Sequence, residues 1–126
     1  MGEYLRYDQL EVFQLAFGLA LEIHEASLVW PKHEQYGGMA DQIRRASKGI
    51  CANMAEGLSK HMSDADERKF LSIALGSTEE VKVWLKFAVK LGYVSQESFL
   101  KWVACYDKVG RMVFGLMQRR KELKAA

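Results

Sequence analysis

The sequence predicts an all-α protein, an antiparallel up-down-up-down four-helix bundle formed by a single domain over residues 1–126. Apolar residues recur at four-three spacing in four segments, and no stretch alternates apolar and polar residues as a strand would. The chain contains one proline, Pro31, and its connections are short. Because 49% of its residues are hydrophobic and 27% are charged, it resembles an ordinary globular domain with one core.

The first helix is expected to begin near Asp8 and to end before Trp30 and Pro31. The Asp8 carboxylate can cap the first free amides, with Glu11 three residues later, and proline disfavours helix in the residue before it. A second apolar stripe widens the first one. Since a helix that is apolar on most sides is buried on most sides, this pattern indicates oligomerisation. The first stripe is Val12, Ala16, Leu19, Ile23 and Ala26, and the residues that widen it are Phe13, Leu15, Phe17, Ala20 and Leu21.

The other three helices have recognisable ends. The second is expected from Met39 to Leu58. The third is expected to begin near Ser63, where Asp66 three residues later resembles a capping box, and to end at Gly92 as a left-handed cap. The fourth begins after Ser95 and carries two neighbouring stripes, so it too is expected to be buried on two sides. The predicted stripe of the third helix is Phe70, Ala74, Ser77, Val81, Trp84, Ala88 and Leu91; those of the fourth are Phe99, Val103, Tyr106, Gly110, Val113 and Met117, and Trp102, Val109 and Leu116.

Small residues on the second and third helices predict a close crossing. In an antiparallel hairpin that turns near His61, Gly76 lies level with Ala46 and Ser47. A glycine inside a helix costs about 1 kcal/mol relative to alanine, so its presence calls for a packing reason. We therefore expect Gly49 and Gly76 to lie where the two helices approach closely.

The same register brings Arg44 and Arg45 level with Glu79 and Glu80. An arginine–carboxylate pair between the helices is the expected result, with Arg45 buried against Glu80 or Glu79. The alternative is that one arginine faces outward and contacts phosphate, and the sequence leaves open which of the two is buried. The neighbouring Asn53, on the inward stripe, is expected to satisfy backbone groups at a helix end.

Three segments carry a resemblance to a known family: QIRRASKGICANMAEG at 42–57, FLSIALGSTEEV at 70–81 and LGYV at 91–94. Together with the loop that begins at Trp30 and Pro31, they resemble the small four helix bundle proteins, also called 23S rRNA intervening-sequence or S23-like proteins. The chain departs from that pattern at 48–51, where the family reads closer to Ser-Ile-Pro. The positions that match the motif of the second helix are Gln42, Arg44, Arg45, Ala46, Asn53, Ala55, Glu56 and Gly57.

The resemblance implies a bundle that assembles as a homopentamer. It also implies a link to nucleic acid, because some members are encoded within insertions in 23S rRNA genes. A related accessory protein of diversity-generating retroelements binds nucleic acid and a reverse transcriptase. Many members have no assigned activity, so the resemblance implies the fold more strongly than the function.

The residues do not predict an enzyme, and no catalytic, cofactor-binding or metal-binding residue is expected. None of the three histidines follows a glutamate by three residues, as the di-iron bundles require. There is no glycine-rich phosphate loop and no Gly-x-Ser-x-Gly motif. Cys51 and Cys105 are 54 residues apart, and we expect both to be reduced core or interface residues.

The distribution of charge is more informative than the net charge of +2. Residues 1–29 carry one cation against five acids, whereas residues 99–126 carry seven cations against two acids. Such asymmetry packs an acidic element beside a basic one, or displays a basic face. Phosphate contacts by RNA or DNA are predicted at the basic face, repeated by oligomer symmetry. The predicted nucleic-acid-binding residues are Arg111, Arg119, Arg120, Lys121 and Lys124.

Two other interpretations of this surface stay open. Cations at the end of a helix also complement its dipole, which requires no partner. Alternatively, the protein is a protein–protein interaction scaffold with no nucleic-acid role, and the basic surface docks an acidic protein. No membrane partner is expected, because the longest apolar run has ten residues and a span needs about twenty. The N-terminus lacks the features of a signal peptide, so the cytoplasm is the expected location.

Overall fold

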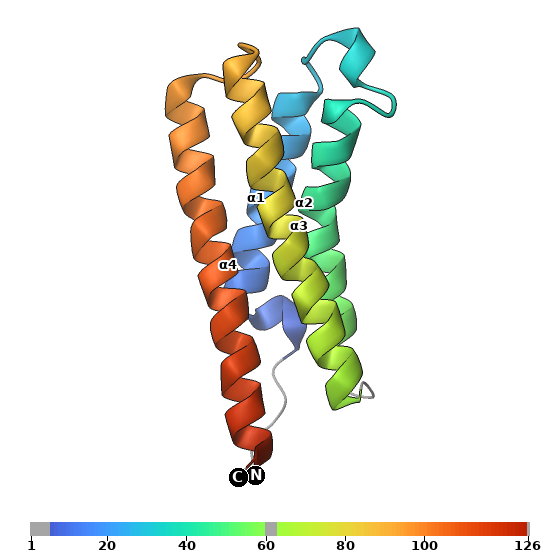
Figure 1. The fold of residues 1–126 in the computed structure, drawn as a ribbon, viewed down its shortest axis with the longest axis vertical. Coiled ribbons are helices and arrows are strands. Elements are labelled where there is room, and N and C mark those ends of the chain that lie inside the picture. The colour runs from blue at the N-terminus through green and yellow to red at the C-terminus, as the bar shows by residue number, and fades with distance from the viewer. Residues whose placement is uncertain (1–5, 60–62, 126) are drawn as a thin grey trace.

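Four long helices, each packed on its neighbours in the sequence, form the molecule, and α4 closes the bundle against α1 (Figure 1). The computed structural model describes residues 6–59 and 63–125. Neighbouring helices run in opposite directions, which confirms the predicted all-α four-helix bundle. The elements are η1 (Tyr7–Gln9), α1 (Glu11–Ser27), η2 (Lys32–Glu34), α2 (Met39–Gly57), α3 (Asp64–Lys90) and α4 (Gln96–Ala125).

The start of the first helix differs from the prediction. A 3-10 turn, η1, precedes α1, and Leu10 takes the N-cap position without a side-chain cap. The predicted cap by Asp8 is wrong, because its carboxylate instead accepts a hydrogen bond from the Arg6 guanidinium at 3.0 Å. The cap of this short turn is formed by Gln9, whose side-chain oxygen accepts from the Arg6 backbone N–H at 2.9 Å. The sequence indicates a polar helix start but places it one turn too early.

Both ends of α3 are as predicted. The Ser63 hydroxyl accepts a hydrogen bond from the Asp66 backbone N–H at 3.2 Å and so caps the helix N-terminus. At the other end Gly92 has φ +81°, a left-handed conformation that favours glycine and ends the helix. These two local signals therefore delimit a helix of 27 residues.

The core is formed by one stripe from each helix, although the stripe predicted for α3 is partly wrong. Ala74, Val81 and Ala88 are buried as expected, but the predicted Leu91 is exposed. The predicted stripe crosses from the buried face of the helix to a second apolar face that is exposed. The buried residues of α3 are Glu67, Leu71, Ala74, Thr78, Val81, Leu85 and Ala88, and those of the central part of α4 are Trp102, Tyr106, Val109 and Val113.

The close approach between α2 and α3 lies at Gly57 rather than at Gly76. A Cβ on Gly57 would lie 3.0 Å from the Phe70 Cβ, whereas a Cβ on Gly76 would meet nothing within 4 Å. The predicted crossing at Gly76 is therefore wrong. Gly49 does face α3, but a Cβ there would lie 3.7 Å from the Ser77 hydroxyl, an ordinary contact distance. The hairpin register is thus about one helical turn away from the predicted one.

Large apolar side chains also remain on the outside of the bundle. The sequence prediction assigns this excess to the first and fourth helices, and both do carry exposed apolar residues. The largest such set, however, lies on α3, on the face that the predicted stripe cuts across. The exposed residues within the helices are Phe17 and Leu21 on α1, Ile73, Val83 and Phe87 on α3, and Leu100 and Phe114 on α4; those outside them are Leu28, Val29, Tyr36 and Leu91. Within residues 6–59 and 63–125, no helix has the length and apolarity needed to cross a membrane.

Candidate functional site

Arg44 is the most highly connected side chain of the motif on α2. Its Nη1 donates to the Ser27 hydroxyl at 2.8 Å, and its Nη2 donates to the Gln35 side-chain oxygen at 3.1 Å and to the Gln35 carbonyl at 3.4 Å. Ser27 is fully buried at the end of α1 and donates in turn to the His24 carbonyl at 3.0 Å. The half-buried Arg44 therefore ties the end of α1 and the following loop to α2.

Arg45 lies on the outside of α2, so the predicted pairs between Arg45 and Glu80 or Glu79 are wrong. Its side chain is 76% exposed and pairs with Asp41 one turn earlier, at 3.1 Å. Glu80 accepts from the Trp84 indole N–H at 3.0 Å, and Glu79 forms an ion pair within its own helix. Arg45, Glu79 and Glu80 all lie on exposed faces of their helices, and each is engaged within its own helix. Of the two arginines, Arg44 is the one with a bracing role.

The loop before α2 is held by a carboxylate at the helix N-terminus. Glu34 accepts a hydrogen bond from the Met39 backbone N–H at 2.9 Å and another from the Tyr93 hydroxyl at 2.9 Å. These bonds hold the pKa of Glu34 below its usual value, the Met39 N–H contributing most. Gly38 is required beside it, because a Cβ at that position would lie 2.6 Å from the Glu34 Cα. Capping boxes and apolar stripes are local signals, so they do not reveal a cap formed across a loop.

Asp41 completes the loop from the other side. It accepts from the Gly37 backbone N–H at 3.0 Å and from the Arg45 Nε at 3.1 Å. The bond from Arg45, followed by that from Gly37, holds the pKa of Asp41 below its usual value. Gly37 has φ +74°, a left-handed conformation that suits glycine. Both carboxylates of this region are therefore already engaged by donors of the loop or of α2.

The remaining residues of the motif have smaller roles. Asn53 donates to the Gly49 carbonyl at 2.8 Å, so it does satisfy a backbone group, but within its own helix rather than at a helix end. Gln42 is half-buried and Glu56 is exposed. Gly57 is the residue at which helix packing demands the absence of a side chain.

The acidic helix α1 lies beside the basic helix α4, which is one of the two arrangements that the charge asymmetry predicts. The Glu22 carboxylate accepts from the Trp102 indole N–H at 3.0 Å and lies 3.9 Å from the Lys101 ammonium. Farther along, Glu11 and Lys108 lie 3.8 Å apart. Arg111 is exposed on α4. The other predicted nucleic-acid-binding residues lie on the last turns of α4, but their side chains are outside the described residues: Arg119, Arg120, Lys121 and Lys124.

The two cysteines are free thiols, Cys51 buried and Cys105 half-buried. Burial raises the pKa of Cys51 to about 11, so this thiol stays protonated at neutral pH and is a poor nucleophile. Within residues 6–59 and 63–125, no group of three or more histidine, cysteine or acidic side chains is placed to hold a metal ion.

Comparisons with known proteins give a family and a fold. The model of a family described as 23S rRNA-intervening sequence protein matches residues 8–115. A crystal structure of a protein of unknown function from the S23 ribosomal protein family of Bacteroides thetaiotaomicron is similar, with a TM-score of 0.75 and 22% sequence identity. The match covers 84% of this chain and 97% of that chain. No curated protein matches. The relation to the retroelement accessory protein stays a prediction.

Proposed function

Because the chain belongs to the 23S rRNA-intervening sequence protein family, we propose that it is a non-enzymatic, self-associating bundle that binds nucleic acid through the C-terminal part of α4. The family's name associates it with an intervening sequence of 23S rRNA. The observation that carries the proposal is the course of α4, a single helix that continues to Ala125 and carries seven cations against three acids.

The C-terminal part of α4 projects from the packed region. Val113 is the last buried residue among those whose side chains are described, and α4 continues for about three turns beyond it. In Figure 1 this part of α4 extends past the N-terminal end of α3. The backbone therefore carries the C-terminal cations away from the core. Such a surface suits phosphate contacts, which depend on charge and not on base sequence.

Self-association would multiply this charge. Helices α1, α3 and α4 each expose more than one large apolar side chain. Single exposed apolar residues are normal on a protein surface, whereas contiguous apolar patches mark interaction sites. The resemblance supplies the number five for the assembly. In a symmetric oligomer each copy repeats the same basic surface, so a modest patch becomes a strong positive field.

A second candidate is a protein–protein scaffold with no nucleic-acid role. The outer face of α3, with Ile73, Val83 and Phe87 exposed, favours it because a nucleic acid gains little from such side chains. For either candidate we propose the cytoplasm as the location. Two free cysteines are in keeping with a reducing compartment.

Two measurements on the wild-type protein test the proposal. Light scattering at micromolar concentration should give several times the 14.4 kDa of one chain; a mass near 14.4 kDa would refute self-association. Retention of a DNA or RNA duplex should be strong at about 50 mM salt and should fall steeply by about 200 mM. If neither duplex is retained at the lower salt, the nucleic-acid interpretation fails and the scaffold takes its place.

A further inference from the structure

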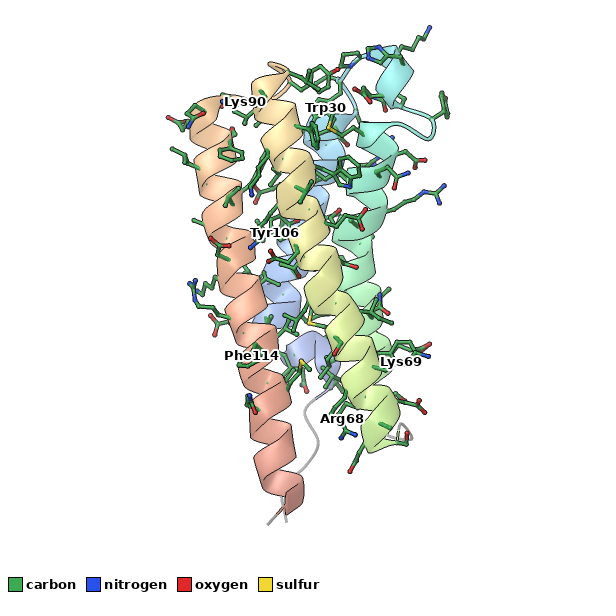
Figure 2. All side chains as sticks on the ribbon, in the orientation of Figure 1. Trp30, Arg68, Lys69, Lys90, Tyr106 and Phe114 are labelled. Atoms are coloured by element: carbon green, nitrogen blue, oxygen red, sulfur yellow. The ribbon has the colours of Figure 1, made fainter. Side chains whose placement is uncertain are left out.

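A cavity of about 500 Å³ lies at the loop end of the bundle, beside Arg44. Figure 2 labels Trp30 at this end, and Figure 1 shows the end of α4 at the opposite one. The volume falls within the range of small-molecule sites. The lining combines apolar side chains with cations and contains no acid: Leu28, Trp30, Lys32, Gln35, Tyr36 and Arg44.

Arg44 brings a positive charge without an ion-pair partner to this cavity. Its hydrogen-bond partners, Ser27 and Gln35, are uncharged, and no ion pair within residues 6–59 and 63–125 includes it. Asp41, one turn earlier on α2, is engaged by Gly37 and Arg45, and Arg44 is the smallest of the influences that lower its pKa. A half-buried cation without a bound counter-ion is costly, which favours binding of an anion there.

Arg44 also has donors to spare. A guanidinium carries five N–H groups, and the bonds to Ser27 and Gln35 use at most three of them. Arginine N–H groups bind phosphate through strong, charge-assisted hydrogen bonds. Lys32, exposed on η2, adds a second cation to the same lining. Two cations suit a phosphate monoester, which carries close to two negative charges at neutral pH.

The rest of the lining suits a flat apolar body. The Tyr36 side chain is 93% exposed, an unusual state for an aromatic ring, and Leu28 is half exposed. Trp30, 5% exposed, is held at 5.6 Å from the Tyr93 ring and forms a fixed wall. Exposed aromatic rings stack on nucleobases, and this stacking tolerates every base.

We propose that this cavity binds a nucleoside monophosphate, with the phosphate at Arg44 and Lys32 and the base against Tyr36. The ligand is either a free nucleotide or the 5′-phosphorylated end of a strand, since both present the same chemistry. The site lies at the opposite end of the bundle from the C-terminal cations and does not depend on them.

The three tryptophans provide an internal control for the test. Of these, only Trp30 lines the cavity, so the indole N–H signal of Trp30 should shift in a ¹H–¹⁵N spectrum on titration with adenosine 5′-monophosphate, while those of Trp84 and Trp102 stay in place. Adenosine, which lacks the phosphate, should bind at least about tenfold more weakly. A short thymidine oligonucleotide with a 5′-phosphate, compared with its 5′-hydroxyl form, then separates a strand end from a free nucleotide as the source.

Exposed lining residues are changed in place of Arg44, because Arg44 also braces the fold. Lys32→Gln and Tyr36→Ala should each weaken binding of the nucleotide about tenfold and leave the spectrum otherwise unchanged. Lys90→Gln removes a cation from the same end of the molecule but not from the cavity, and should bind as the wild type does. The proposal is overturned if the nucleotide leaves the Trp30 signal unmoved, if adenosine binds equally well, or if Lys32→Gln binds like Lys90→Gln.

Discussion

At the loop end of the bundle, polar side chains are used to hold backbone in place, whereas at the opposite end α4 continues beyond its core residues with cations along it. The loop end uses Arg44 and Glu34 to join α1, the loop, α2 and the Tyr93 region. Of the last seven residues of α4, four are cations and one is an acid. The difference teaches that cations of one small protein can have different uses: Arg44 fixes the geometry of the loop end, whereas the proposed function assigns the C-terminal cations to phosphate contacts.

Removing the brace should produce the largest loss of stability. Arg44→Ala deletes hydrogen bonds to buried Ser27 and to Gln35, and bonds from a charged donor contribute about 1.5–3 kcal/mol. Its neighbour provides a matched control, because the exposed pair of Arg45 with Asp41 is worth about 0–1 kcal/mol. Urea unfolding of Arg44→Ala and Arg45→Ala should therefore separate the two variants clearly. Equal losses would contradict the assigned roles.

Two glycines, one on α2 and one on α3, test the packing of these two helices against each other. Gly57→Ala places a Cβ at 3.0 Å from Phe70 and should cost about 1–3 kcal/mol by overpacking. Gly76→Ala meets no atom and should instead stabilise the helix by about 1 kcal/mol. Thermal melting of both variants compares them directly. A Gly76→Ala variant that melts below the wild type would show that this face is packed against another copy.

The predicted pH effect at the loop end is smaller. The pKa of Glu34 lies below its usual 4.5 in the folded state, so the unfolded chain binds more protons at acidic pH. The stability that this carboxylate adds is present above its usual pKa and is lost as the pH falls through the lowered folded pKa. A charge at a helix N-terminus is worth about 0.3–1 kcal/mol. Glu34→Gln should thus be less stable than the wild type at neutral pH, and the gap should narrow steadily as the solution is acidified; a constant gap would argue against this assignment.

Local signals predict the fold well. The caps at Ser63 and Gly92 are formed by neighbours in sequence, so they survive whatever the other helices do. The prediction of a cap by Asp8 is wrong because its carboxylate accepts a hydrogen bond from the guanidinium of Arg6, two residues earlier, which is as near in sequence as the helix amides. The α3 stripe is partly wrong because two faces of this helix are apolar, and periodicity does not say which of them faces the core.

The candidate site is less predictable, because its hydrogen bonds join distant segments. Arg44 reaches Ser27, 17 residues earlier, and Glu34 reaches Tyr93, 59 residues later. No spacing rule links such pairs. The predicted pair of Arg45 with Glu80 fails for another reason: both residues lie on exposed faces of their helices, and the level of a residue along a helix does not say which way its side chain points. The adjacent glycines Gly37 and Gly38 are the one sequence signal that marks this loop as tightly built.

The two ends of the bundle are assigned different roles, and the salt dependence of duplex binding tests this division most directly. The measurement compares the wild type with a variant in which Arg119, Arg120, Lys121 and Lys124 are all replaced by glutamine, and with the control Lys86→Gln/Lys90→Gln on α3. The slope of log affinity against log salt should flatten by about 0.9 for each phosphate that the C-terminal variant no longer neutralises, with its melting temperature unchanged. The control should keep the wild-type slope. A C-terminal variant with the wild-type slope, or a control whose slope flattens as much, would contradict the division of labour between the two ends.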